Sequence, residues 1–571
     1  MRITNVKLTN WRSCQEVSFA TGRITAFVGA NNAGKTGILS ALDFLMGSNW
    51  PSLQRLDDSD FYGRTRKNGL RIQVWFEKQA DQALHSAWFE VGSERGGETG
   101  GRFKFKEDGP TYNLKNEFRD RFPLIFLDAE RSYERQFGTS RYTLFGQALR
   151  RLEEHFSDQV GEDQKRQLGH HLDAAQKVLR TDMYDTFVTA VSDAFREQLR
   201  HTRHGLNIEF RAFDPFQFYK ALHPFLTEGE DRLSATEAGS GLRNMLVLAL
   251  FRAYGKSFRG DGMVAIEEPE LFLHPHAQRG LMRMFREIAL NGTQILYSTH
   301  SSAFVDLERF DDVVVVERCP DEFSEELCTT ARSLSEAELL QRHRKNRPGE
   351  TIGIQGIRER YRHACGAEHT EALFGRVVVL VEGATEAACL PMYADAIGMN
   401  LDALGVSVVN ARGKDGLESL HHVYAGLGFA VYVVFDNDLG KPSGGTKDIA
   451  KRQTSNLRLT RLLGIGETDT PAPSVGRTYA VMDRDFENVI RREVGAEQED
   501  LYDRLAAGAK EQYGTDSKPV AARHIAEYLT VLSYVPPTIR AILEEVALLA
   551  GHVPAGPGPM LDSTSKAAPV A

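Results

Sequence analysis

The segment GANNAGKT, residues 29–36, constrains the fold of the first part of this chain more than any other feature. It matches the pattern G-x-x-x-x-G-K-[ST] and directly follows the apolar, strand-forming run ITAFV. Glycines in this pattern let backbone N–H groups curl around phosphates, the lysine reaches the terminal phosphates, and the final hydroxyl is a magnesium ligand. The motif therefore predicts a nucleotide site, with Asn32, Gly34 and Lys35 at the phosphates and Thr36 at the metal.

Two later segments extend this predicted site. GMVAIEEPELFLHP places Glu267 and Glu268 after a short apolar strand, and QILYSTH ends another strand at His300. A first carboxylate in such a place holds the magnesium shell, and a second polarises the attacking water. The alternative makes the glutamates a solvated strand end and His300 a surface residue. The order of the three elements along the chain favours the nucleotide site, with His300 at the position of the histidine that senses the γ-phosphate in ABC-type ATPases.

A family resemblance supports this interpretation. ITNVKLTNWRSC, FVGANNAGKTGILSALDFL, IEEPELFLHPHAQ and LYSTHSS resemble the SMC/RecF-type branch of ABC ATPases. In that branch two heads sandwich ATP, and a signature segment of one head completes the site of the other. Here that segment falls in SATEAGSGLRNM, around Gly239, Ser240 and Gly241, which departs from the usual LSGGQ. The departure weakens the case for fast hydrolysis by fully paired heads, but it leaves nucleotide binding untouched.

The stretch VYVVFDNDLG ends an apolar strand in two aspartates, Asp436 and Asp438, separated by one residue. VVVLVEGATE likewise puts Glu382 just past a strand and Glu386 four residues later, on the same side of a following helix. Helical sequence lies between these strands, which favours a parallel sheet whose carboxyl ends share one edge. Four carboxylates at one edge repel one another unless divalent cations neutralise them. Either motif alone also fits an ordinary polar strand or helix end, whereas the ordered pair favours a magnesium or manganese site.

The pair, a glutamate after the first strand and D-x-D after a later one, resembles the Toprim module. Further along, VMDRDFENVI offers Asp483, Asp485 and Glu487, and GTDSKPVAARHIAEY places Lys518 at an apparent helix start. In a nuclease, extra carboxylates hold a second metal and a lysine steadies the charge that grows on the scissile phosphate. Each segment also fits an ordinary surface.

An SMC/RecF-like ATPase followed by Toprim in one chain resembles the OLD (overcoming lysogenisation defect) nucleases, which are related to the Gabija nuclease subunit. The resemblance implies an ATP-binding DNA endonuclease in anti-phage defence or DNA processing. It implies two Mg²⁺ or Mn²⁺ ions at the Toprim site, one ion with the nucleotide, and a homodimer or higher homo-oligomer, and it admits a helicase-like partner. The implied Toprim metal ligands are Glu382, Glu386, Asp436, Asp438, Asp483 and Glu487, and Lys518 is the implied phosphate-contacting residue.

Other functions remain open. A topoisomerase needs a catalytic tyrosine on a DNA-binding domain, which the sequence does not reveal, and a primase usually brings a zinc-binding or helicase domain. The chain also fits a repair or sensor ATPase that acts as a scaffold without nuclease activity of its own. Basic stretches at 63–69, 342–347 and 410–416 either contact phosphates or form solvated surface.

Composition fits a multidomain globular protein. With 571 residues the chain is too long for one core, and 42% hydrophobic with 26% charged residues is ordinary. The net charge of -9 excludes a polycation that coats nucleic acid, although a local basic groove or bound metal can still serve DNA. Five scattered cysteines without a CxxC pattern disfavour a disulfide framework and fit a reducing cytoplasm. The chain has no apolar run of about 18 residues, so no membrane partner is expected.

The expected fold is α/β: an ABC-type ATPase head with a helical insertion, then a Toprim domain with a parallel-sheet core. Apolar residues at helical spacing predict two or three helices from 143 to about 202, with a break near Gly161. These helices form a packed subdomain or an exposed arm, and the OLD resemblance favours a dimerisation element. The expected divisions are 1–142 and 206–332 for the ATPase, 143–205 for the insertion, 333–370 for a helical connector, 371–548 for Toprim and 549–571 for a disordered tail.

Overall fold

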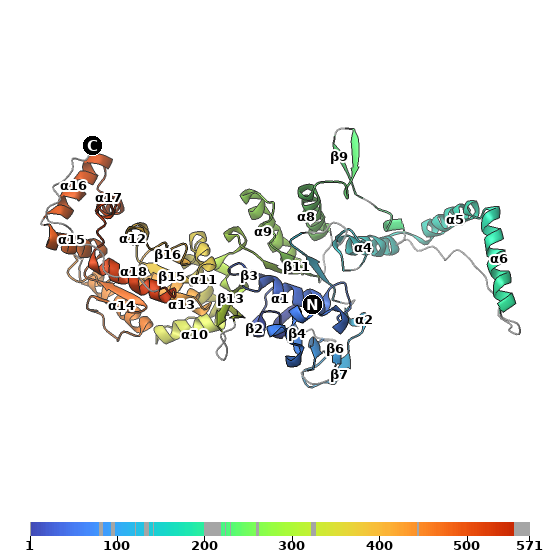
Figure 1. Ribbon diagram of the computed structural model, residues 1–571, viewed down its shortest axis with the longest axis horizontal. Helices are drawn as coiled ribbons and strands as arrows, with labels where there is room; N and C mark the ends of the chain where they lie inside the picture. Colours follow the sequence, from blue (N-terminus) through green and yellow to red (C-terminus); the bar gives the residue numbers. More distant parts are fainter. Residues whose placement is uncertain are drawn as a thin grey trace.

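The computed structural model describes residues 2–78, 84–92, 98–119, 122–130, 136–140, 142–198, 218–222, 224–228, 230–257, 262–320, 327–441, 445–498 and 500–552. The described chain is elongated, with the N-terminal domain in the middle, the C-terminal helices at one end and helices α5 and α6 reaching out at the other (Figure 1). Within these residues, no helix combines the length and the apolar character needed to cross a membrane. The predicted tail at 549–571 overlaps the end of the last helix, and residues 553–571 lie outside the described part.

The N-terminal domain contains two six-stranded sheets with a helix between them. The first is antiparallel, in the order β2-β1-β4-β5-β6-β7, and its strands are Cys14–Ala20, Ile3–Trp11, Leu70–Phe76, Ser86–Val91, Glu98–Lys104 and Thr111–Asn113. Strand β4 alternates buried and half-buried residues, as expected for a sheet with one face on the core. Helix α1 (Lys35–Met46) fills the space between this sheet and the second one, and its apolar residues join the core that both sheets share.

The second sheet carries the nucleotide motifs and is parallel except at one edge. Its order is β14-β13-β3-β12-β11-β8, with strands Leu327–Ser333, Val313–Pro320, Ile24–Val28, Gln294–Ser298, Met263–Glu267 and Leu124–Leu127. Only β14 runs antiparallel to its neighbour, β13. Strands β3, β11 and β12 are buried at every residue because α1 covers one face and α8 (Ser240–Ser257) with α9 (Pro275–Leu290) covers the other.

Three helices form the predicted insertion: α4 (Leu144–Gln159), α5 (Glu162–Leu179) and α6 (Asp182–Gln198). The first break lies at Val160 and Gly161, next to the predicted position. Helix α4 packs beside α8 on the head, whereas α5 and α6 extend away from it (Figure 1). A two-stranded hairpin, β9 (Phe225–Glu228) and β10 (Asp231–Ser234), follows the insertion before α8.

The second half of the chain is a five-stranded sheet preceded by two helices, α10 (Glu336–Asn346) and α11 (Ile354–Ala364). The sheet order is β16-β15-β17-β19-β18, with strands Val406–Asn410, Val377–Val381, Ala430–Asp436, Tyr479–Met482 and Ser474–Val475. The first four are mutually parallel and β18 is antiparallel. Its helices are α12 (Ala384–Ala396), α13 (Lys414–Gly426), α14 (Thr446–Leu463), α15 (Phe486–Glu497), α16 (Leu501–Tyr513), α17 (Lys518–Val531) and α18 (Pro537–Leu549).

Short 3-10 helices complete the described chain. They are Leu53–Arg55, Asp58–Asp60, Tyr62–Arg64, Arg66–Asn68, Ser302–Phe304, Leu307–Asp312 and Ala367–Phe374, and the short helix α2 spans Asn116–Arg119. The α/β prediction for both halves is thereby confirmed, and both sheets present the carboxyl ends of their parallel strands to one edge.

Candidate functional site

The phosphate loop lies at the carboxyl end of β3, between that strand and α1. Gly29 adopts a φ of 146°, and a Cβ placed there would lie 2.0 Å from the carbonyl oxygen of Val316, so only glycine fits. Lys35 is buried, and its Nζ donates to the carbonyl oxygens of Gly29 at 2.8 Å and Ala30 at 2.9 Å. Burial lowers the pKa of Lys35 to about 8. The loop therefore presents a lysine whose charge is incompletely satisfied and is available to an anion.

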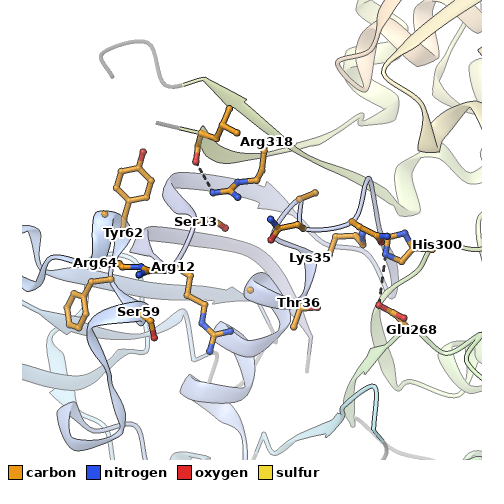
Figure 2. A pocket seen from close by; sticks show the side chains of 18 residues that line it. Arg12, Ser13, Lys35, Thr36, Ser59, Tyr62, Arg64, Glu268, His300 and Arg318 are labelled. Carbon is orange, nitrogen blue, oxygen red and sulfur yellow. Dashed lines mark hydrogen bonds and ion pairs between the residues drawn. The ribbon is translucent and has the colours of Figure 1, made fainter. Parts of the chain in front are cut away.

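A cavity of about 880 Å³ opens above this loop (Figure 2). Exposed Asn32 and Thr36 stand at its mouth with Lys35, while Arg12, Tyr62 and other residues of the antiparallel sheet and its loops line the far wall. The volume is that of a small-molecule site. Strand β14 closes another side, because the Thr329 hydroxyl donates to the carbonyl oxygen of Ala33 at 2.9 Å.

The two glutamates at the end of β11, Glu267 in the strand and Glu268 just after it, reach the same edge of the sheet as the phosphate loop. Glu267 is buried, its Oε2 accepts from the backbone N–H of Ala129 at 3.2 Å, and burial raises its pKa. Glu268 has a φ of 42°, a strained value that turns its side chain toward the cavity it lines. Its Oε1 lies 4.0 Å from Nε2 of His300, which lines the same cavity (Figure 2).

A third glutamate was missed in the sequence. Glu270 accepts from the backbone N–H of His300 at 2.6 Å and from the Thr299 hydroxyl at 3.0 Å, and so fixes the loop that carries the histidine. Burial raises the pKa of Glu270. The signal was present in the pattern E-E-P-E, whose last carboxylate follows the strand end by three residues.

The segment predicted as the ABC signature spans the turn after β10 and the start of α8. In the described part of the chain, none of its residues lines the cavity. Its role as the signature segment stays a prediction.

The second candidate site lies at the carboxyl edge of the C-terminal sheet. Glu382 follows β15 and Asp436 ends β17, and the backbone N–H of Asp436 donates to Glu382 Oε2 at 3.3 Å. Asp438 adopts a left-handed φ of 57°, which keeps it at this edge. Asp436 is buried, and its Oδ1 has no hydrogen-bond partner among the described residues. A buried carboxylate oxygen without a donor is costly, so this site calls for a cation.

Two lysines, which the sequence did not single out as site residues, partly supply that charge. Lys414 Nζ binds Asp438 and also donates to Asn456 Oδ1 at 2.8 Å. Lys441 Nζ lies 3.0 Å from Asp436 Oδ2, 2.6 Å from Asp438 Oδ1 and 3.7 Å from Asp485 Oδ2.

The carboxyl groups of this cluster differ in their pKa. Burial, followed by the charge of Glu382, raises the pKa of Asp436 to about 8, and burial raises that of Glu386 to about 7. Burial also raises the pKa of Glu382. At Asp438 burial acts in the same direction, but hydrogen bonds from Lys414 and Lys441 outweigh it and lower the pKa.

Two further predicted metal ligands, Glu386 and Glu487, lie in the first turns of α12 and α15. Glu386 is buried at the start of α12 and accepts from the backbone N–H of Gly383 at 3.1 Å. Glu487 Oε1 accepts from the Thr385 hydroxyl at 3.4 Å, next to Glu386 in the chain.

Three residues on the flanks behave differently. Asp485 caps α15, and its carboxylate lies near the Lys441 ammonium. Asp483 was predicted to be a metal ligand, but it pairs with Arg492 instead. Lys518 begins α17, is exposed, and makes no hydrogen bond or ion pair with a described residue.

The cluster has the donors that a divalent ion requires. They are carboxylate oxygens from separate elements, and one of them has no hydrogen-bond partner in the part of the chain that the structure describes. The Lys441 ammonium shows that a cation is accommodated between Asp436 and Asp438. These residues fit Mg²⁺ or Mn²⁺.

Among the described residues, the group with metal-ligand spacing lies elsewhere, between α10, α11 and α13. One ligand atom each of His343, Glu418 and His422 falls within 4.8 Å of the others, and all three residues are buried. Glu418, however, already receives Nε of Arg347 at 2.9 and 3.0 Å, and the Tyr361 hydroxyl lies 2.7 Å from Nδ1 of His422. We therefore interpret the group as a hydrogen-bonded structural network.

This network corrects part of the interpretation of the basic stretch 342–347 as either solvated surface or a phosphate contact. Arg344 and Lys345 are exposed, whereas His343, Asn346 and Arg347 are buried, the last two with hydrogen bonds to Glu418. Of the other two basic stretches, 63–69 contributes Arg64 to the nucleotide cavity and 410–416 contributes Lys414 to the carboxylate cluster.

Two family models match the chain. Residues 24–306 match "AAA domain, putative AbiEii toxin, Type IV TA system", and residues 373–438 match "Overcoming lysogenization defect protein-like, TOPRIM domain". The two matches contain the phosphate loop with Glu268 and His300, and Glu382 with the D-x-D pair, respectively. An ATPase domain and a TOPRIM domain imply the use of a nucleotide and of divalent metal.

Among curated proteins, the chain is 26% identical over 457 residues to the OLD nuclease of Thermus scotoductus, covering 76% of this chain and 82% of that protein. It is 23% identical over 514 residues to the Old nuclease of Escherichia phage P2, covering 81% of this chain and 82% of that protein. Solved structures with some likeness include Stu0660 of Streptococcus thermophilus (TM-score 0.35, 13% identity, 63% of this chain and 85% of that one). The SMC head domain from Thermotoga maritima also matches (TM-score 0.29, 13% identity, 59% of this chain and 100% of that one).

Proposed function

Because this chain belongs to the OLD family, in which an ATPase domain is joined to a TOPRIM domain, we propose that it is an ATP-binding, divalent-metal-dependent DNA endonuclease. The observation that carries the proposal is the meeting of buried Asp436 with half-buried Glu382 and Asp438, with one Asp436 oxygen lacking a donor among the described residues. A solvated strand end would expose this oxygen to water.

In this proposal Glu382, Asp436 and Asp438 hold the first divalent ion. Glu386 and Glu487, at the starts of α12 and α15, hold the second divalent ion, and Asp483 is a further candidate ligand of that ion. When bound, such ions polarise a phosphodiester oxygen and lower the pKa of an attacking water. The protein's own part is to fix these carboxylates on strand and helix ends, where packing holds their geometry. Lys518 is the proposed contact to the scissile phosphate.

The nucleotide half of the proposal places ATP in the cavity above the phosphate loop. Lys35 binds the terminal phosphates, and Thr36 and Glu267 serve the accompanying magnesium. Glu268 orients and polarises the attacking water, while His300, held by Glu270, senses the γ-phosphate. Nucleotide state then gates cleavage in the C-terminal domain.

The assembly is proposed to be a homodimer or a higher homo-oligomer that pairs through the projecting helices. Val178, Leu179, Met183 and Phe187 expose between 59% and 81% of their surface at the junction of α5 and α6. Such side chains on an extended arm favour an interaction site. The proposed setting is anti-phage defence or DNA processing, with a helicase-like protein as a further partner.

The test is cleavage of supercoiled plasmid with Mg²⁺ or Mn²⁺, with and without ATP. The wild type is expected to nick or linearise the plasmid, Asp436→Asn to lose cleavage while keeping ATP hydrolysis, and Glu268→Gln to lose hydrolysis. Asp402→Asn, an exposed carboxylate in the turn before β16 at the opposite end of the sheet, is the matched control and is expected to cleave normally. Absence of cleavage with every metal, with ATP hydrolysis intact, would favour the scaffold function instead.

A further inference from the structure

Lys441 occupies a cation position inside the carboxylate cluster. Its Nζ contacts Asp436 and Asp438 of the D-x-D pair at 3.0 and 2.6 Å, and Asp485 of another segment at 3.7 Å. Three carboxylates around one ammonium exceed what a single surface ion pair needs. The ammonium therefore neutralises the charge that the predicted metal would neutralise.

The neighbouring lysine is held quite differently. Lys414 is the more buried of the two, with 7% of its side chain exposed, and is fixed from two sides by Asp438 and by Asn456. Asn456 in turn donates to the carbonyl oxygen of Asn437 at 2.8 Å, so Lys414 belongs to the framework that shapes the loop. Lys441 retains 21% exposure, and every ion-pair partner that the structure gives it is a carboxylate of the cluster.

The backbone around Lys441 also differs from that of a framework residue. The residue follows Gly440, with a φ of 73°, in the turn that leaves β17, and α14 begins only at Thr446 after Gly445, with a φ of 130°. A lysine side chain is a flexible stem with a strongly hydrated ammonium. Removing the ammonium from between the aspartates consequently needs only side-chain rotation in a turn.

Resting on the proposed function, we propose that Lys441 is a tethered cation that competes with the divalent ion for Asp436 and Asp438, and that binds a DNA phosphate once the ion displaces it. In the metal-free protein the ammonium keeps the two aspartates from repelling each other. After displacement it remains at the rim of the cluster, where the DNA backbone must approach. Metal loading and phosphate capture are thereby linked in one residue.

The first test measures Mn²⁺ binding by calorimetry on the full chain without nucleotide. Lys441→Gln is expected to bind Mn²⁺ at least about fivefold more tightly than wild type, because a competing positive charge has been removed. Lys441→Arg keeps the charge and is expected to stay weaker than Lys441→Gln. Lys451→Gln, the same charge change at an exposed site on α14, is expected to match wild type. If Lys441→Gln binds Mn²⁺ equally or more weakly, the competition is refuted.

Asp436→Asn separates this inference from the proposed function. It is expected to lose the Mn²⁺ site altogether, and retention of the site in that variant would overturn the proposed metal centre itself. If Asp436→Asn loses the Mn²⁺ site and Lys441→Gln binds Mn²⁺ no more tightly than wild type, only the role of Lys441 is overturned. Thermal unfolding tests whether the variants are folded. Without metal, Lys441→Gln is expected to unfold at a lower temperature than wild type, and adding Mn²⁺ is expected to restore its unfolding temperature.

The second test measures binding to a short duplex by fluorescence anisotropy in Ca²⁺, with a denaturing gel to verify that the DNA stays intact. With metal, Lys441→Gln is expected to bind the duplex severalfold more weakly than wild type. The slope of log K against log salt concentration is expected to become shallower by about 0.9, the contribution of one phosphate contact. Without metal, Lys441 is engaged by the aspartates, so the same variant is expected to show no such loss. An equal loss in both conditions, or none in either, would contradict phosphate capture.

Discussion

The buried ion pair between Arg347 and Glu418 gives the sharpest energetic prediction. Arg347 exposes 6% of its side chain and Glu418 only 3%, and both carboxylate oxygens accept from the guanidinium. Asn346 donates to the same carboxylate at 2.8 Å. In Arg347→Met, Glu418 keeps only this amide donor, and removing one partner of a buried pair costs about 3 to 5 kcal/mol.

The assay is amide hydrogen exchange in α10 and α13, because a chain of this size does not unfold in a single two-state step. At about 1.4 kcal/mol per factor of ten, the opening equilibrium there is expected to rise by a hundred- to a thousandfold or more. Arg347→Met/Glu418→Gln removes the uncompensated charge and is expected to recover much of the loss. Arg523→Met, which breaks an exposed pair with Glu527, is expected to cost less than about 1 kcal/mol. A loss at Arg347 no larger than that at Arg523 would refute the reasoning.

The same pair predicts a pH dependence. Burial acts to raise the pKa of Glu418, but the hydrogen bond and charge of Arg347 outweigh burial and lower it. A carboxyl whose folded pKa is lowered stabilises the protein above its unfolded value of about 4.3, and this contribution is lost as the pH falls through the folded pKa. The wild-type advantage over Arg347→Met in hydrogen exchange is therefore expected at neutral pH and to shrink below about pH 4.

Three further predictions follow from single sites. Gly29→Ala is expected to abolish binding of a fluorescent ATP analogue, since its Cβ would lie 2.0 Å from the Val316 carbonyl oxygen; normal binding would show that the loop tolerates the clash. Glu268→Gln is expected to bind ATP normally but to hydrolyse it at least about a hundredfold more slowly in a phosphate-release assay, and near-normal turnover would assign the water to another residue. Burial lowers the pKa of His421 to about 4 and of His422 to about 3, so both fold neutral. Below the unfolded pKa of about 6.5, local stability is expected to fall by about 1.4 kcal/mol per pH unit for each histidine. An opening free energy of the α13 amides in hydrogen exchange that stays flat from pH 6.5 to 5 would contradict this.

Sequence reasoning located the acidic residues because parallel strands bring their carboxyl ends to one edge. Glu382, Asp436 and Asp438 follow from that rule alone, and the structure brings all three together. It did not locate Lys414 and Lys441, because their approach depends on a left-handed Asp438 and on the turn after it. A strand followed by a carboxylate can be recognised in the sequence, whereas the lysines that compensate the carboxylates come from the start of α13 and from the turn after β17.

The interpretation of the basic stretch 342–347 was wrong for its buried residues, for a related reason. Counting charges in 342–347 gives a basic patch, but a helix distributes consecutive residues around its axis, so some of them point inward. Asn346 and Arg347 donate to the carboxylate of Glu418, which lies more than 70 residues away in the sequence. Such a pairing has no local signature, so a basic run of this kind does not by itself predict a surface.

The buried network also bears on where the C-terminal domain begins. Ile357 and Tyr361 of α11 and Leu339 of α10 belong to the same core as Leu417 and Tyr424 of α13. A fragment of residues 371–552, which begins at the expected Toprim boundary, removes both connector helices and uncovers this apolar face together with Glu418.

A fragment of residues 335–552 retains the connector helices, Arg347 and the Tyr361 hydroxyl that approaches His422. It is therefore expected to be soluble and monodisperse in size-exclusion chromatography, whereas the 371–552 fragment is expected to aggregate or to unfold at a lower temperature. Equal behaviour of the two fragments would mean that α10 and α11 only cover the C-terminal domain. A clear difference would make these helices part of that domain's own core, because an apolar face of this kind must be buried for the sheet to fold.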